Sequence, residues 1–356
     1  MSAKAAPHPQ VIDWRLAGRI ARSLAGSGSG RRSVRRDDLR RAARGTVGVV
    51  RDYTGLKPKG RPPSPEVLNR REWIDANMES LQAMTADVEQ DLANSLDLPR
   101  PVGPGLRAAA GAAAAVELGL VSAYLAQRVL GQYDVALVGP SRPPRLLFVA
   151  PNLADAQHRL GAERDVFLRW VALHEATHVV QFGAVPWLRD HLGGLAEQLL
   201  SGAFSSVSAP ELMRAARRLL SPDPRRLAAA LRRGEWRSPF VGRRRMRLLR
   251  SLQATMTLVE GYSEHVMDAV AGEREFVVLR EKLERSREQR GLLEALLSRL
   301  FGMELKLRQY RLGKAFCDEV ARRRGIETLN RVWDEPSSLP RLSELEQPGR
   351  WLSRVA

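Results

Sequence analysis

A His-Glu-x-x-His pattern at residues 174–178 lies within an apolar stretch, and it constrains the fold of this chain more than any other feature. The neighbours on both sides are largely apolar and include Phe167, Leu168, Trp170, Val171, Leu173, Val179 and Val180. Such a stretch predicts a buried helix, and residues four apart share a helix face, so His174 and His178 can bind one metal ion. Two histidines and a glutamate are costly to bury unless they are paired or bind a metal. The pattern therefore predicts a metal site in a core, with a hydrogen-bonded histidine pair as the alternative.

Glu175, directly after the first histidine, predicts hydrolytic chemistry at this site. It can reach a metal-bound water as a general base. Catalytic zinc usually has three protein ligands and an open position, so a third ligand is expected elsewhere. The metzincin pattern is excluded, because Gln181 and Ala184 stand where it needs glycine and histidine. His191 is a possible third ligand, although the turn expected at Pro186 leaves its direction open.

An acidic row at residues 259–268 offers a better third ligand. Glu260, Glu264 and Asp268 are spaced by four and lie along one helix face, where like charges repel unless something positive faces them. A glutamate ligand followed four residues later by a carboxylate that orients a zinc-bound histidine is the gluzincin arrangement. We therefore predict Glu260 as the ligand and Glu264 as its supporting carboxylate. Glu264 as ligand, and an acidic stripe paired with arginines, are the alternatives.

Two further side chains of this segment could contribute to catalysis. Tyr262 and His265 flank the acidic row, and either could donate a hydrogen bond to a developing oxyanion. Packing or surface roles are the alternatives for both.

Helical spacing dominates the chain, so the expected fold is mainly α with a small sheet or hairpin. One long helix or a pair is expected over residues 66–96, after a Pro/Gly-rich linker at 57–65. The short apolar runs at 134–138 and 145–150 are the expected strands, and the second could be an edge strand that pairs with an extended substrate.

The expected organisation has three parts. A basic helical region covers residues 1–60, and the main helical domain covers 61–335. That domain includes the small sheet near 134–150 and a basic insert at 214–250, and a Pro-rich tail covers 336–356.

The net charge of +17 is concentrated in the first 60 residues and in the basic insert. Segments 31–59 and 214–250 therefore predict a possible anionic partner, such as nucleic acid or an anionic surface. Solvated helix faces on an arginine-rich protein are the alternative.

The sequence favours a cytoplasmic protein. The most apolar segment, Ala108 to Gln127, is rich in alanine and has Glu117 near its middle, so a buried helix is expected there and not a membrane span. The single cysteine, Cys317, excludes a disulfide framework within the chain.

Several phrases of the sequence resemble an actinobacterial family of zincin-like metallopeptidases that is often labelled as associated with coenzyme F-420 biosynthesis. The shared phrases are IDWRLAGRIA, RREWIDANMESL, RVLGQYD, LLFVAPN, FLRWVALHEATHVVQFGAVPWLRDHL and VEGYSEHVMD. The resemblance covers nearly the whole chain and implies a largely helical zincin-like hydrolase. His174, Glu175, His178 and the segment around Glu260 match the family pattern, which implies a Zn²⁺ cofactor.

Three functions remain open at this point. The first is a zinc-dependent peptidase in which Glu175 takes the proton from the attacking water. The second is a metal-dependent hydrolase of small-molecule amides, for example of a poly-glutamylated cofactor. The third is a non-catalytic basic protein that binds nucleic acid or an anionic surface and has a structural or vestigial metal site.

Overall fold

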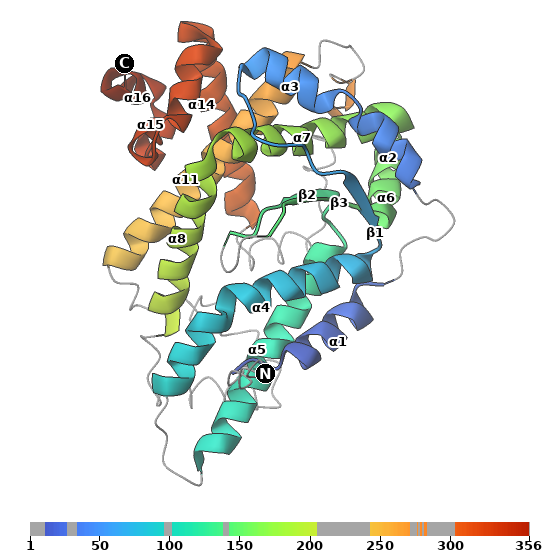
Figure 1. Ribbon diagram of the computed structural model, residues 1–356, viewed down its shortest axis with the longest axis vertical. Helices are drawn as coiled ribbons and strands as arrows, with labels where there is room; N and C mark the ends of the chain where they lie inside the picture. Colours follow the sequence, from blue (N-terminus) through green and yellow to red (C-terminus); the bar gives the residue numbers. More distant parts are fainter. Residues whose placement is uncertain are drawn as a thin grey trace, which may run out of the picture. The chain divides into compact units, whose positions relative to one another are not determined.

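The computed structural model describes residues 11–26, 34–95, 102–137, 142–204, 243–270, 276, 278–279, 281–282 and 303–355 (Figure 1). The described chain is mainly helical with one small sheet, which confirms the expected fold class. Most of the basic insert at 214–250 lies outside the described residues. Among the described residues, no helix combines the length and apolar character that a membrane crossing requires.

The chain divides into two compact units, each built from separate stretches of sequence. The helices within the first are α1 (Trp14–Leu24), α4 (Arg70–Ser95) and α5 (Val102–Ala126). The second contains α2 (Arg36–Ala43), α3 (Thr46–Thr54), β1 (Pro65–Leu68), β2 (Gly131–Asp134), β3 (Arg145–Val149), α6 (Ala150–Leu160), α7 (Arg164–Ala184), α14 (Met303–Asn330), η1 (Arg331–Trp333), η2 (Pro336–Ser338), α15 (Leu342–Glu346) and α16 (Pro348–Val355). Helices α8 (Pro186–Phe204) and α11 (Arg243–Val270) each contribute residues to both units. The three-part division expected from the sequence stays a prediction.

A buried carboxylate fixes the start of α1 in the first unit. Glu89 accepts hydrogen bonds from the backbone N–H of Val11 at 2.8 Å, from that of Ile12 at 3.2 Å, and from Trp14 Nε1 at 2.8 Å. These three bonds compensate the cost of burying a charged group and satisfy N–H groups near the helix start. Glu89 thereby joins α1 to α4.

The small sheet of the second unit has the strand order β1-β3-β2. Strand β1 runs parallel to β3, and β2 runs antiparallel to it, with Glu66 opposite Leu147 and Gln132 also opposite Leu147. The expected helix over 66–96 therefore begins only at Arg70, because residues 65–68 form a strand. Strand β3 is central and buried, so the expectation that 145–150 forms an edge strand is wrong.

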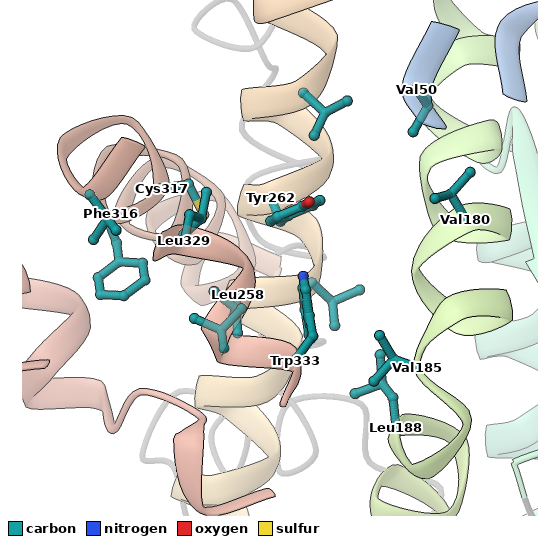
Figure 2. Packing of buried hydrophobic residues seen from close by; sticks show 14 of the residues in the cluster. Val50, Val180, Val185, Leu188, Leu258, Tyr262, Phe316, Cys317, Leu329 and Trp333 are labelled. Atoms are coloured by element: carbon teal, nitrogen blue, oxygen red, sulfur yellow. The ribbon is translucent and has the colours of Figure 1, made fainter. Parts of the chain in front are cut away.

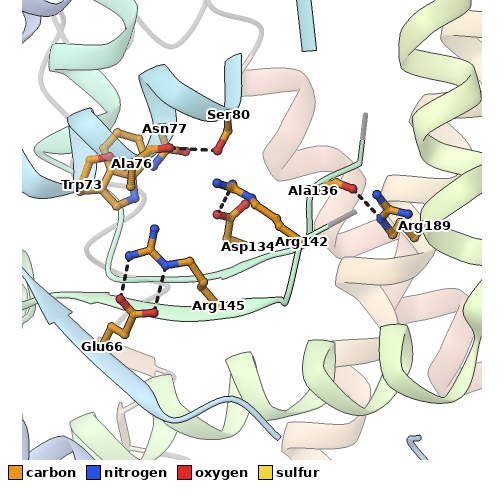
Figure 3. A network of polar contacts seen from close by, with 10 residues as sticks. All are labelled: Glu66, Trp73, Ala76, Asn77, Ser80, Asp134, Ala136, Arg142, Arg145 and Arg189. Carbon is orange, nitrogen blue, oxygen red and sulfur yellow. Dashed lines mark hydrogen bonds and ion pairs between the residues drawn. The ribbon is translucent and has the colours of Figure 1, made fainter. Parts of the chain in front are cut away.

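Ion pairs hold the ends of these strands in place (Figure 3). Arg145 on β3 binds Glu66 on β1 through two nitrogens, at 3.0 and 2.7 Å. Arg142 binds Asp134 at the end of β2 at 2.7 Å, and Arg189 Nε donates to the carbonyl oxygen of Ala136 at 2.5 Å. The last contact ties the segment after β2 to α8.

The larger hydrophobic core of the second unit surrounds α11, and Figure 2 shows part of it. It includes Tyr262 of α11, Phe316 of α14 and Val180 of α7, all of them fully buried. The Pro-rich tail contributes Trp351, whose ring packs edge-on against Phe316 with centroids 5.5 Å apart.

Two glycines set the approach of α11 to α14. A Cβ atom on Gly261 would lie 2.1 Å from the carbonyl carbon of Gly313, so the two backbones touch where no side chain fits. This contact fixes the helix that carries the acidic row.

Candidate metal centre

Helix α7 presents one face to the core and another to the candidate site. Its first turn is capped by Glu163, whose carboxylate accepts hydrogen bonds from the N–H groups of Asp165 at 3.0 Å and Val166 at 2.7 Å. Leu173 and Val180 belong to the hydrophobic core. His174 and His178 are one turn apart, and their Nε2 atoms lie 3.2 Å from each other.

Glu260 of α11 completes a group of three converging ligand atoms. Its Oε2 atom lies 3.6 Å from His174 Nε2 and 3.7 Å from His178 Nε2. All three side chains belong to the second unit, and they form the candidate metal-binding group found among the described residues.

The spacing of these atoms fits tetrahedral zinc. Bonds of about 2.0–2.2 Å from zinc to nitrogen and oxygen place neighbouring tetrahedral ligands about 3.3–3.6 Å apart. The separations of 3.2, 3.6 and 3.7 Å are close to this range. Two imidazoles and one carboxylate are also a donor set that zinc commonly takes in hydrolases.

The electrostatics of the group favour a cation among these side chains. Burial opposes the charged form of His178, but the hydrogen bond and charge of Glu260, together with Glu175, outweigh it and raise the pKa of His178 to about 9. A proton can thus occupy His178 when no metal does. Burial raises the pKa of Glu175 to about 7; positive His178 opposes the rise and negative Glu260 adds to it.

Strand β2 covers Glu175. A Cβ atom on Gly131 would lie 2.7 Å from Glu175 Oε1 and 2.8 Å from its Cγ, so only glycine fits against this carboxylate. The backbone N–H of Tyr133 donates a hydrogen bond to the same side chain. Glu175 is 5% exposed, and the strand holds its position beside the two histidines.

The remaining imidazole nitrogens have neutral partners that the sequence did not suggest. His178 Nδ1 lies 2.9 Å from Oε1 of Gln181, and His174 Nδ1 lies 3.1 Å from Oγ of Ser263. Helical spacing was the signal that could have indicated both partners. Gln181 lies three residues after His178, and Ser263 lies three residues after Glu260. The gluzincin arrangement predicts a carboxylate in this role, whereas the partners of both Nδ1 atoms are neutral side chains.

The other predicted residues of α11 lie outside the group of converging ligand atoms. Asp268 pairs with Lys314 of α14 at 2.8 Å, and Glu264 is partly buried. Tyr262 is fully buried and donates to Asn330 Oδ1 at 2.7 Å, so its hydroxyl is committed within the core.

His265 belongs to a separate polar network between α3, α11 and α14. Its Nδ1 atom lies 2.7 Å from Asp318 and its Nε2 atom 2.9 Å from the hydroxyl of Tyr53. Lys314 bridges Asp318 to Asp268 on the far side of this network. The structure thus does not bring His265 or Tyr262 to the group of His174, His178 and Glu260. The same holds for His191, which packs on α8 against Trp187 with ring centroids 5.9 Å apart.

Comparisons with known proteins identify a matching family model and a similar solved structure. The family model described as "Zincin-like metallopeptidase" matches residues 12–352 of the chain. A crystal structure from Chloroflexus aurantiacus, described as that of a candidate hydrolase with a novel fold, is similar with a TM-score of 0.65 and 30% sequence identity. The match covers 96% of this chain and 98% of that one. No curated protein matches the chain.

Proposed function

Because the chain belongs to the zincin-like metallopeptidase family, we propose that it is a zinc-dependent hydrolase of peptide or other amide bonds. The observation that carries the proposal is the convergence of His174 Nε2, His178 Nε2 and Glu260 Oε2, at separations that fit one tetrahedral ion. The family implies a metal, and the two imidazoles favour zinc over magnesium or calcium, which prefer oxygen ligands. Cys317 is a buried free thiol, which is compatible with the proposed cytoplasmic location.

Each side chain of the site has a defined task in this proposal. Zinc, when bound, supplies a Lewis acid that polarises a carbonyl group and lowers the pKa of a water molecule. Glu175 accepts the proton of the attacking water and returns it to the leaving amine. Burial raises the pKa of Glu175 in the metal-free site, and Tyr133 N–H keeps the carboxylate in position. Strand β2, an edge of the described sheet, could pair with an extended peptide.

Metal analysis tests the proposal directly. We expect about one zinc per chain in protein purified without chelator, and almost none in a His174→Ala/His178→Ala double variant. Zinc affinity should also fall as the pH is lowered, because His178 has a pKa of about 9 without metal and zinc must displace its proton. Elemental analysis and a zinc titration at two pH values measure both effects. A His158→Ala variant, in which a histidine of α6 is replaced, is the control. Equal zinc in the double variant and the wild type contradicts the proposal.

A second candidate function has support from residues 35–61, which include α2, α3 and the segment after them. Nine basic side chains of this region are exposed, against two exposed acidic ones, Asp37 and Asp52. The basic residues are Arg35, Arg36, Arg40, Arg41, Arg44, Arg51, Lys57, Lys59 and Arg61. Arginine forms bidentate hydrogen bonds with phosphate, so this surface supports binding of nucleic acid.

Salt dependence tests this second candidate. Binding of a labelled DNA duplex should weaken with salt, and an Arg36→Ala/Arg40→Ala double variant should reduce the slope of log K against log[salt] by about two. An Arg322→Ala/Arg323→Ala variant on the exposed face of α14 is the matched control. Fluorescence anisotropy gives the slope, and an equal loss in both variants would assign the binding to overall charge.

A further inference from the structure

We propose that Gln181 is a positioning residue that selects the metal-binding tautomer of His178 and fixes the helix carrying Glu260. The inference rests on the proposed function, because it assigns a task within the same zinc site. Gln181 is fully buried on α7, one turn after His178. Its amide makes one contact to His178 and one to α11.

The orientation of the Gln181 amide follows from its second contact. The side chain lies 3.1 Å from the backbone carbonyl oxygen of Val259, which can only accept a hydrogen bond. The amide nitrogen must therefore face Val259, and the amide oxygen must face His178. This oxygen lies 2.9 Å from His178 Nδ1, and since it can only accept, Nδ1 must carry a hydrogen.

This orientation determines what the other nitrogen of His178 can do. With the hydrogen of the neutral ring on Nδ1, the lone pair of Nε2 points out of the ring as a metal ligand requires. Ser263 supports the same tautomer at His174, since its hydroxyl can donate to His174 O at 3.4 Å and accept from Nδ1 at 3.1 Å. Two neutral histidines held in this way present lone pairs to each other across 3.2 Å. With both rings neutral this contact is no hydrogen bond, so a metal ion or a proton must lie between the two nitrogens.

The same amide also ties α7 to α11 at the third ligand. Val259 is the residue directly before Glu260, so its carbonyl oxygen and the Glu260 side chain belong to one turn of α11. A single side chain thus sets the tautomer of one ligand and the position of the helix that supplies another. Loss of either contact should loosen the site without removing any metal ligand.

Two variants of Gln181 separate these contacts from simple packing. Gln181→Met keeps the length of the side chain but neither donates nor accepts as the amide does, and we expect zinc affinity to fall about 10- to 100-fold. Gln181→Glu keeps an acceptor for His178 Nδ1, and we expect it to bind zinc more tightly than Gln181→Met. Thr177→Val is the matched control, because Thr177 is fully buried on the same helix and its hydroxyl bonds only the helix's own backbone at Leu173.

The readout is the zinc dissociation constant of the full chain, from competition with a chromophoric chelator. The unfolding midpoint of each metal-free variant is measured alongside, so that a folding defect is seen separately. Wild-type affinity in folded Gln181→Met, or an equal loss in Thr177→Val, overturns the inference and leaves the proposed function standing. If Gln181→Met does not fold, the Gln181→Glu variant is compared with Thr177→Val instead. A zinc affinity of Gln181→Glu more than 100-fold below that of Thr177→Val overturns the role of residue 181 as a hydrogen-bond acceptor for His178. A wild-type chain that binds no zinc overturns the proposed function, and this inference with it.

Discussion

Replacing Glu175 with glutamine should abolish hydrolysis while zinc stays bound. The substitution keeps the shape of the side chain and an oxygen that can accept from Tyr133 N–H, but glutamine cannot take a proton from water. Loss of a general base typically lowers the rate about 10²- to 10⁴-fold. Because Glu175 lies beside the ligands and is outside the converging group, the zinc content should stay near that of the wild type.

The measurement combines turnover with metal analysis on the same preparation. Fluorogenic peptide libraries and poly-glutamyl amides serve as substrates, since peptides and small-molecule amides are both within the proposal. Glu319→Gln, at a partly exposed position of α14 far in sequence from the site, is the control for the loss of one glutamate charge. Full activity in Glu175→Gln would remove the main chemical support for hydrolysis at this site, whereas loss of zinc would make Glu175 part of the metal-binding group.

Removing the Glu260 carboxylate should release most of the zinc, and removing that of Glu264 should not. Glu260→Ala leaves two histidines, and two ligands hold zinc poorly compared with three. Glu264 is outside the group of converging ligand atoms, so Glu264→Ala should at most weaken binding about 10- to 100-fold, as expected for a supporting residue.

Zinc titration of the two variants at matched pH gives the ranking. Asp268→Ala, which removes the ion pair with Lys314, is the control for an acidic residue of the same row. Greater zinc loss in Glu264→Ala than in Glu260→Ala would move the ligand to Glu264. Full affinity in both, with zinc loss in a His191→Ala variant, would contradict the three-ligand assignment altogether.

Parts of the site could be predicted because they depend only on neighbours along one helix. Glu175 and the two histidines share a helix whose apolar flanks predict burial, and helical periodicity brings His174 and His178 to one face. The same periodicity placed Glu260, Glu264 and Asp268 along one face of α11, and it made this row a better source of the third ligand than His191.

The choice within that row required the packing of α11 against α7 and α14. Gln181 meets Val259 and Ser263 meets His174, so the register of the two helices brings Glu260 between the histidines. Each residue turns the helix by about 100°, which directs Tyr262 and His265 away from Glu260 and toward the core and α14. The sequence of residues 259–268 by itself does not indicate how α11 is aligned against α7.

The sheet shows the same division between local pattern and tertiary contact. The apolar run of β3 was readable as a strand, but β1 is a Pro-containing segment of four residues whose partner lies about eighty residues later in the chain. The sequence by itself determined the helical class, the face of α7 that carries both histidines, and the acidic row, because these follow from residues three and four apart. Only the tertiary structure decided which carboxylate of the row lies beside the histidines, the contacts of Gln181 with Val259 and of Ser263 with His174, and the cover that Gly131 gives to Glu175. Each of these is a contact between elements that are distant in sequence, and the position of one element against another is set by the packing of the whole core.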